Sequence, residues 1–347
     1  MTMQPQLVPE AGGSPNPGTP DSPLSEAGVA AAPQEVVGRS PGQLAWRRFR
    51  KDRSGVISAS IVIFFFLIAF AAPLIEKLYG KDPYTRYGQI HPGLLNEVGA
   101  PIAPNGGISG EHWFGIEPAV GRDVLMQLVY GIRTSLLLAV VVVIIVTVVG
   151  TILGITAGYL GGKVDYVISR VIDTLLAMPS QLFFIAFTPI VLALFVSERE
   201  TTPTMLRATA LIIVLSLFGW TRIARILRGQ VLSMREREYI EAAKVSGAGS
   251  GRIIFKELLP NLWTPILIVA TLDLPTYVTT EAALSFLGVG MTEPTPDWGR
   301  MINKGFEGMQ SDVTYLAFPA IAMVIFVLAF NLLGDSVRDA LDPKSNR

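Results

Sequence analysis

Hydrophobic residues gather in long runs, and the four clearest of these runs contain no charged residue. Each of the four clearest runs exceeds the roughly 20 apolar residues that cross the ~30 Å hydrocarbon layer of a membrane. The pattern therefore predicts four membrane-spanning helices. The runs lie between Arg53 and Glu76, Arg133 and Lys163, Asp173 and Glu198, and Asp312 and Asp335.

Two further runs are less regular. Only 14 uncharged residues lie between Arg207 and Arg222, but long arginine side chains can reach from a helix end to the membrane surface. The run after Pro260 is long enough to span, although it contains Asp273 and Glu281. Including both, we predict an all-α polytopic membrane protein with six transmembrane helices.

The segments outside the predicted spans differ in character. Residues 1–44 hold eight of the 24 prolines and no aromatic residue, so we expect a disordered tail. The loop between the first two spans, residues 76–129, is rich in Gly and Pro. We expect it to be mostly irregular, with a short helix near residues 121–130.

Composition excludes several kinds of chemistry. Only 16% of the residues are charged, against about a quarter in soluble domains, and the six spans account for this deficit. The net charge of zero predicts no nucleic-acid partner. With no cysteine and two histidines, disulfides, thiolate nucleophiles and a histidine-rich metal site are excluded, so no metal is expected. No phosphate-binding glycine loop and no nucleophile–base motif occurs, so we expect neither a bound cofactor nor catalysis by this chain.

The distribution of Lys and Arg predicts the orientation. With the amino terminus in the cytoplasm, 19 of the 28 basic residues fall on the cytoplasmic side, eight of them in the single segment from Arg222 to Lys256. Cytoplasmic loops carry such an excess of basic residues. Both termini are therefore expected in the cytoplasm.

This basic segment also contains a pattern of two short helices. Residues 238–246 are good helix formers, and Gly247 stands where a helix stop favours a residue that tolerates positive φ. Ser250 is expected to cap a second short helix, which Pro260 ends. Two helices with a glycine joint suit docking in the groove of another protein. The alternative is an amphipathic helix that lies on the membrane surface.

The spacing in this segment resembles the signature loop of the permeases of ABC-type importers. The chain reads EAA, three residues, Gly, and then Leu-Pro twelve and thirteen residues after that glycine. Three further blocks resemble the C-type permease subunit of dipeptide and oligopeptide importers, in the same order as in that family. They are HWFGIEPAVGRDVLMQLVYGIRTSL, EAALSFLGVG with PTPDWGRM, and NLLGDSVRDALDP. One position departs from the pattern, because Glu257 stands where peptide-importer members often have His.

The resemblance implies a type I ABC importer permease fold with a cytoplasmic coupling helix. It covers roughly residues 45–343 and implies a location in the cytoplasmic membrane of a prokaryote. The tail at residues 1–44 lies outside it. The expected order after this tail is first helix and outer loop (45–134), core permease domain (135–343, with the coupling loop at 235–260) and carboxyl end (344–347). Implied partners are a second homologous permease, two ATP-binding subunits that hold ATP and Mg, an extracytoplasmic binding protein, peptide substrate and membrane lipid. Dipeptides, oligopeptides, nickel chelates and haem are all carried by relatives. The residues expected to couple to the ATPase are Glu241, Ala242, Ala243, Gly247 and Pro260.

Four charged residues are candidates for contacts along the transport path. Acids in a span usually face a cavity or a partner, so Asp273 and Glu281 are expected either to border the path or to pack against the second permease. For Glu281, a position near the outer membrane interface is a further alternative. Arg122 and Asp123 are expected at the outer mouth, either as contacts for the delivering protein or as an exposed local pair that stabilises the loop by well under about 1 kcal/mol.

Other classes of protein remain as alternatives. A self-contained secondary transporter would use Asp273 and Glu281 as an ion or proton relay, but leaves the EAA pattern unexplained. The missing nucleophile–base pair argues against a membrane enzyme. A channel would be expected to show rings of charge or backbone carbonyls in its sequence, which are not seen. We therefore expect a non-catalytic subunit of an ATP-driven importer that works by alternating access.

Overall fold

The computed structural model describes residues 41–195, 203–310 and 312–341. These residues form helices and only two isolated β-bridges, so the predicted all-α fold is confirmed. Residues 1–40 of the tail predicted at residues 1–44 lie outside the described residues, as does the carboxyl end predicted at residues 344–347. Residues 41–44 belong to helix α1 (Pro41–Lys51), so the boundary predicted at residue 44 falls inside a helix.

Four helices are long and apolar enough to cross a membrane. A rise of 1.5 Å per residue makes even the shortest, at 27 residues, about 40 Å long. Two bent helix pairs pass the same test when each is taken as one span, so the described residues hold up to six spans, the number predicted. The four unbent helices are α2 (Arg53–Tyr79), α5 (Val124–Leu160), α8 (Thr204–Met234) and α14 (Thr314–Leu341).

The third predicted span is broken rather than continuous. Helices α6 (Gly162–Ala177) and α7 (Ser180–Ala193) meet at 94°. Between them Met178 is extended, with φ −88° and ψ 140°. The following Pro179 explains this conformation, because a proline ring clashes with helical backbone in the residue before it.

The fifth span is bent as well. A helical stretch of α10 (Ser250–Arg252), the π-helix η1 (Ile253–Leu258) and α11 (Leu259–Asn261) meets α12 (Trp263–Phe286) at 64°. Two details of the prediction are wrong here. Ser250 is the first helical residue and Gly249 occupies the cap position, without a side-chain hydrogen bond. Pro260 lies in the first turn of α11, where a missing N–H is tolerated, and the break comes two residues later at Leu262.

Helices α5 and α8 form the most extensive helix–helix contact, and glycines make it possible. Gly150, Gly154 and Gly158 recur at every fourth position of α5 and face α8. A Cβ atom on Gly154 would lie 2.6 Å from the carbonyl oxygen of Ala224. Without side chains at these positions, the two backbones approach closely, as small residues allow in membrane helices.

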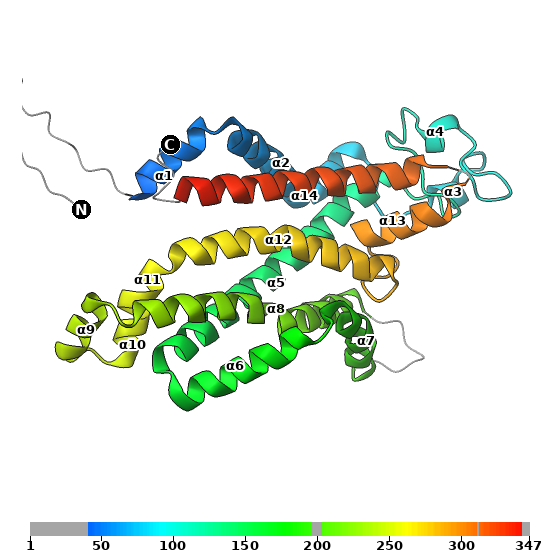
Figure 1. The fold of residues 1–347 in the computed structure, drawn as a ribbon. Coiled ribbons are helices and arrows are strands. Elements are labelled where there is room, and N and C mark those ends of the chain that lie inside the picture. The colour runs from blue at the N-terminus through cyan, green and yellow to red at the C-terminus, as the bar shows by residue number, and fades with distance from the viewer. Residues whose placement is uncertain (1–40, 196–202, 311, 342–347) are drawn as a thin grey trace, which may run out of the picture. The chain divides into compact units, whose positions relative to one another are not determined.

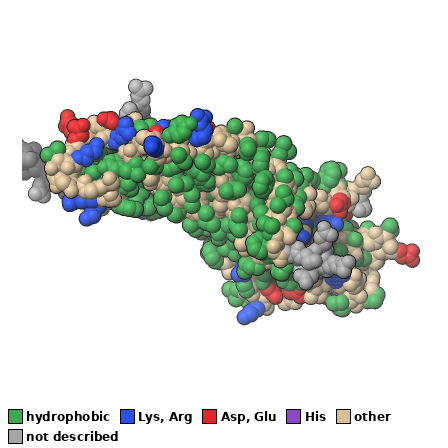
Figure 2. All heavy atoms as spheres, turned by 90° about the horizontal axis from the view of Figure 1, so that it is seen from below, with side chains coloured by type: hydrophobic (Ala, Val, Ile, Leu, Met, Phe, Trp, Pro, Cys, Tyr) green, Lys and Arg blue, Asp and Glu red, His purple; other side chains and the backbone are tan. Residues whose placement is uncertain are grey.

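Irregular segments lie at opposite ends of this helical unit (Figure 1). The cap, residues 80–123 between α2 and α5, contains only the four-residue helices α3 (Tyr87–Ile90) and α4 (Pro104–Gly107). The short helix expected near residues 121–130 is the beginning of α5. At the other end lies the 235–260 loop with α9 (Glu238–Val245). Figure 2 shows a broad band of hydrophobic side chains on one face, with charged side chains gathered toward its edges.

Candidate functional site

The 235–260 loop is a fixed platform with an exposed outer surface. Ile240, Ile253 and Leu258 are buried and anchor α9 and η1 to the helical core. Gly247 has φ +79°, the left-handed conformation predicted for it, and its N–H donates to the carbonyl of Lys244 at 2.9 Å. A side chain at this position would be strained even though the surrounding space is open.

The residues predicted to couple to an ATPase lie on this platform. Glu241, Ala242, Gly247 and Pro260 are exposed, and Ala243 is half-buried against the core. The structure adds two apolar side chains that sequence reasoning did not single out. Val245 is 89% exposed and Phe255 is 66% exposed. Such exposure of large apolar groups beside α9 is typical of a surface that another protein covers.

Asp273 lies on α12 inside a span, and α8 supplies its counter-ion. Arg222 Nη1 donates to Asp273 Oδ1 at 2.7 Å. The aspartate side chain is 6% exposed and the arginine side chain 55% exposed. Both residues line a pocket of about 230 Å³. Sequence reasoning treated Arg222 only as the end of a span, and nothing local in the sequence links it to a residue 51 positions later.

Glu281 has different surroundings, although it lies on the same helix. Its side chain is fully buried, and Ser285 Oγ donates to its Oε1 at 3.0 Å. Glu281 lines none of the pockets described for the structure. The structure therefore does not bring Asp273 and Glu281 together in one site.

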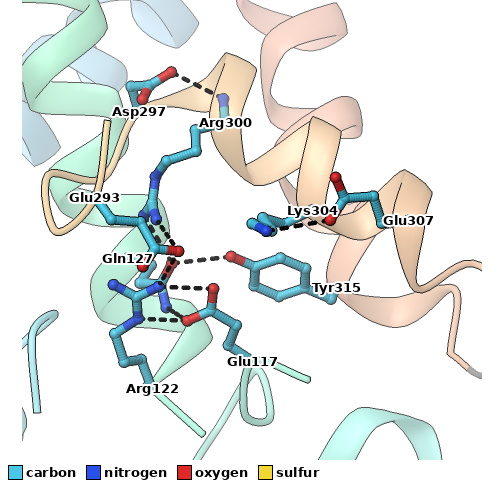
Figure 3. A network of polar contacts seen from close by, with 9 residues as sticks. All are labelled: Glu117, Arg122, Gln127, Glu293, Asp297, Arg300, Lys304, Glu307 and Tyr315. Atoms are coloured by element: carbon cyan, nitrogen blue, oxygen red, sulfur yellow. Dashed lines mark hydrogen bonds and ion pairs between the residues drawn. The ribbon is translucent and has the colours of Figure 1, made fainter. Parts of the chain in front are cut away.

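A buried polar network joins the cap to the helices (Figure 3). Arg122 forms a two-pronged ion pair with Glu117 and also reaches Glu293 at 3.2 Å. Gln127 donates to Glu117 at 2.7 Å, and its amide oxygen accepts a hydrogen bond from Tyr315 at 2.9 Å. This network ties the beginnings of α5 and α14 to the segment before α13 (Trp298–Glu307).

Arg122 and Asp123 do not pair with each other, and the expectation of an exposed local pair is wrong. Both are buried, at 2% and 0% exposed. Asp123 Oδ1 caps α5 by accepting from the N–H of Met126, and Oδ2 contacts His112 Nδ1 at 2.8 Å. Because the partners of both side chains belong to the cap and to the neighbouring helices, these residues hold the cap on the helices.

Glu117, Glu293 and Arg300 also belong to this network, and sequence reasoning did not select them. Glu117 and Arg300 lie in the two blocks HWFGIEPAVGRD and PTPDWGRM, and Glu293 immediately precedes the second. A signal was present, since charges stand inside otherwise apolar and glycine-rich blocks. Among the described residues, no group of three or more His, Asp or Glu side chains is placed to hold a metal ion.

Asp297 is the buried acid at the start of α13. Its Oδ1 accepts from the N–H of Arg300 at 3.0 Å, which caps the helix. Burial raises the pKa of Asp297 to about 6, although hydrogen bonding and the positive charge of Arg300 act in the opposite direction. The folded protein therefore takes up a proton here at a pH where the unfolded chain has already lost it.

This raised pKa predicts a pH-dependent stability. As the pH rises from about 4 to about 6, the contribution of Asp297 to the free energy of unfolding falls, because its carboxyl ionises first in the unfolded chain. Asp297→Asn keeps a capping side chain without the charge. It should raise the free energy of unfolding at pH 7.5 by an amount on the order of 1–3 kcal/mol, with the gain shrinking toward pH 4.

Thermal unfolding in detergent between pH 4.5 and 7.5 measures this effect. Asp297→Ala is the control that removes both charge and cap, and it should be about 1 kcal/mol less stable than the Asn variant. An Asn variant that melts below the wild type at pH 7.5 would contradict the prediction.

Comparison with known proteins agrees with this architecture. The fold is that of a multi-spanning, all-helical membrane protein whose cap and loop lie at opposite ends. The chain belongs to the family described as binding-protein-dependent transport system inner membrane component, whose model matches residues 150–347. A second model, the N-terminal TM domain of oligopeptide transport permease C, matches residues 40–93. The family resemblance predicted from the four sequence blocks is thereby confirmed.

Curated relatives match over nearly their whole length. The dipeptide transport system permease protein DppC of Alkalihalophilus pseudofirmus is 36% identical over 88% of this chain and 90% of its own. The oligopeptide transport system permease protein OppC of Escherichia coli K12 is 36% identical over 89% of this chain and 93% of its own. The glutathione transport system permease protein GsiD of Escherichia coli O6:K15:H31 is 35% identical over 88% of this chain and 91% of its own.

A solved structure shows the same fold. A chain of the inward-facing MetNI methionine ABC transporter aligns with a TM-score of 0.51 at 21% identity, covering 63% of this chain and 98% of that one. The predicted type I importer permease fold is thus confirmed. Membership of a binding-protein-dependent transport family argues against the alternative of a self-contained secondary transporter.

Proposed function

We propose that this chain is one of two permease subunits of an ATP-driven importer of peptides. The observation that carries the proposal is the rigid 235–260 loop, which presents an exposed surface at the end of the helices opposite the cap. The permease relatives named for dipeptide, oligopeptide and glutathione transport support a peptide substrate. The chain itself is not catalytic in this proposal, and ATP and Mg are held by partner subunits.

The 235–260 loop is the proposed contact with an ATP-binding subunit. Glu241, Ala242 and Gly247 would meet the partner, whereas Ala243 and Pro260 shape the platform. Buried Ile240 anchors the loop to the helical core, and a bend joins the loop to α12. Because the loop is anchored in this way, a displacement of the loop would move α12 with it. When ATP closes the two ATPases, the coupling loop of each permease would move with the ATPase groove that holds it. This movement would tilt the spans and so open the path to one side of the membrane at a time.

Orientation and the remaining partners follow from this arrangement. The 235–260 loop and both termini would lie in the cytoplasm, and the cap would face the extracytoplasmic binding protein. A second homologous permease would complete the path across the membrane lipid, with the core domain at residues 135–343 as this chain's half. Arg122 and Asp123 would act at the mouth by holding the cap in place, and the binding protein would touch the surface above them.

Asp273 and Glu281 have different proposed roles. Asp273 borders the transport path, which its position in a pocket with a half-exposed arginine supports. Glu281 is fully buried and accepts a hydrogen bond from Ser285, which favours a structural role for it beside the path. Neither arrangement resembles an ion relay, in which titratable groups follow one another along a pathway.

Reconstitution tests the proposal. The chain would be purified with its partner permease, ATPases and binding protein, and then inserted into proteoliposomes with ATP inside. Uptake of a labelled dipeptide such as Ala-Ala should require ATP, the binding protein and all membrane subunits. Uptake by this chain alone, driven by a proton or sodium gradient without ATP, would overturn the proposal.

A further inference from the structure

The pocket that contains Asp273 is built from four helices. Its walls come from the end of α6, α7, α8 and α12, and it measures about 230 Å³. Complete small-molecule sites are usually about 300–1,000 Å³. The pocket is therefore the size of a partial site, as expected for one wall of a path that a second subunit completes.

The lining combines an ion pair with aromatic rings and hydroxyl groups. Phe184, Phe218 and Tyr277 supply the rings, and Gly219 leaves room for Tyr277, whose hydroxyl would lie 2.0 Å from a Cβ at that position. Thr276 and Thr280 donate to carbonyls of their own helix. Their hydroxyl oxygens keep lone pairs that can accept from a ligand.

The ion pair leaves much of its binding capacity free. Among the described residues, Arg222 uses one of its five N–H donors, on Asp273 Oδ1. Asp273 is fixed by burial, whereas the half-exposed Arg222 side chain has room to move. Charged residues inside spans are costly, and those that persist usually mark a path for substrate or ions.

Removing Arg222 alone would leave the buried charge of Asp273 uncompensated, which is strongly unfavourable. A zwitterion avoids this cost, because it brings both charges. Its ammonium group can replace the guanidinium beside Asp273 while its carboxylate takes the place of Asp273 on Arg222.

We propose that Arg222 and Asp273 form a transient site for the two charged ends of a peptide that passes through the membrane. The inference rests on the proposed function and adds a chemical preference within the path, for substrates with a free amino and a free carboxyl end. Because the pair neutralises itself when empty, binding is an exchange of partners and stays weak. Weak binding is what a transport path requires, since the substrate must also leave.

The test compares modified and unmodified peptides in the complete reconstituted complex. Ala-Ala, N-acetyl-Ala-Ala and Ala-Ala-amide are each supplied at concentrations that saturate the isolated binding protein. The wild type should transport Ala-Ala about tenfold faster than either blocked form, as expected for one lost charged hydrogen bond. Asp273→Asn should abolish the preference over the N-acetyl form, and Arg222→Gln the preference over the amide.

Arg225→Gln is the matched control. Arg225 lies on the same helix and pairs with Asp173 at 2.6 Å, but neither residue lines the pocket. This variant should keep both preferences. The double variant Arg222→Met with Asp273→Leu removes both charges together, so it leaves no unpaired charge even if the single variants assemble poorly.

Loss of both preferences in an assembled double variant supports the site. Wild-type preferences in that variant would overturn it and show a purely structural ion pair. Equal rates for all three peptides in the wild type would overturn it as well. A wild-type complex without any ATP-driven peptide uptake would instead refute the proposed function, and the site with it.

Discussion

Replacing Val245 with aspartate is expected to reduce ATP-driven uptake at least about tenfold without destabilising the chain. The side chain is 89% exposed at the end of α9, so the fold of the chain does not depend on it. Burying a valine against a partner contributes about 1.5–3 kcal/mol, and aspartate would both lose this contribution and bring a charge into the interface.

Three measurements check this expectation together. They are the amount of ATPase subunit that co-purifies, the rate of ATP hydrolysis stimulated by the loaded binding protein, and the melting temperature of the chain. Val98→Asp is the matched control, because Val98 is 88% exposed but lies in the cap. It should leave ATPase capture unchanged. Full stimulation of ATP hydrolysis in the Val245→Asp variant would contradict the proposal that the 235–260 loop contacts the ATPase.

The residues predicted from the sequence belong in the same experiment. Glu241→Ala tests the exposed acid of α9, and Gly247→Val tests the left-handed joint. Gly247→Asn is its paired control, because asparagine tolerates positive φ better than a β-branched residue. We expect coupling to fall more with valine than with asparagine.

Gly154→Leu is expected to prevent α5 and α8 from packing and so to remove most folded protein. Even the first atom of the new side chain would lie 2.6 Å from the carbonyl oxygen of Ala224 and 2.9 Å from its Cα atom. Both are backbone atoms, so the helices themselves must move apart. Overpacking commonly costs about 1–3 kcal/mol and occasionally more, and this contact is central to the bundle.

Yield from size-exclusion chromatography in detergent and the melting temperature measure the loss. Gly154→Ala should have an intermediate effect. Gly229→Leu is the matched control on α8, since a Cβ there meets no atom within 4 Å. Leucine at this position should be neutral or slightly stabilising, because glycine is a poor helix former. Equal yields for the two leucine variants would contradict the close α5–α8 contact.

The number and approximate places of the spans could be predicted because a membrane imposes a simple requirement on the chain. Each crossing needs a long apolar run, and such runs are visible without knowledge of any contact. The joint at Gly247 was predictable for a similar reason, since its positive φ is a local property of the backbone. The family resemblance was predictable as well, because it rests on short contiguous blocks of sequence.

The bends and partners were not predictable from such local patterns. The hydrophobic run that predicted the third span continues through the 94° break at Met178–Pro179, so hydropathy does not reveal the break. The exposed pair expected of Arg122 and Asp123 was wrong because their neighbouring positions suggested contact, whereas the fold turns them toward different partners.

The sequence by itself thus determined the all-helical membrane fold, the six spans and the 235–260 loop, because these depend on runs and spacings within short segments. Only the tertiary structure decided that Asp273 faces Arg222, that Glu281 is fully buried, and that Val245 is left uncovered. Each of these depends on which helix faces which, and packing between distant segments fixes that choice. The ion pair of Arg222 and Asp273, which are 51 positions apart in the sequence, could therefore be found only from the structure.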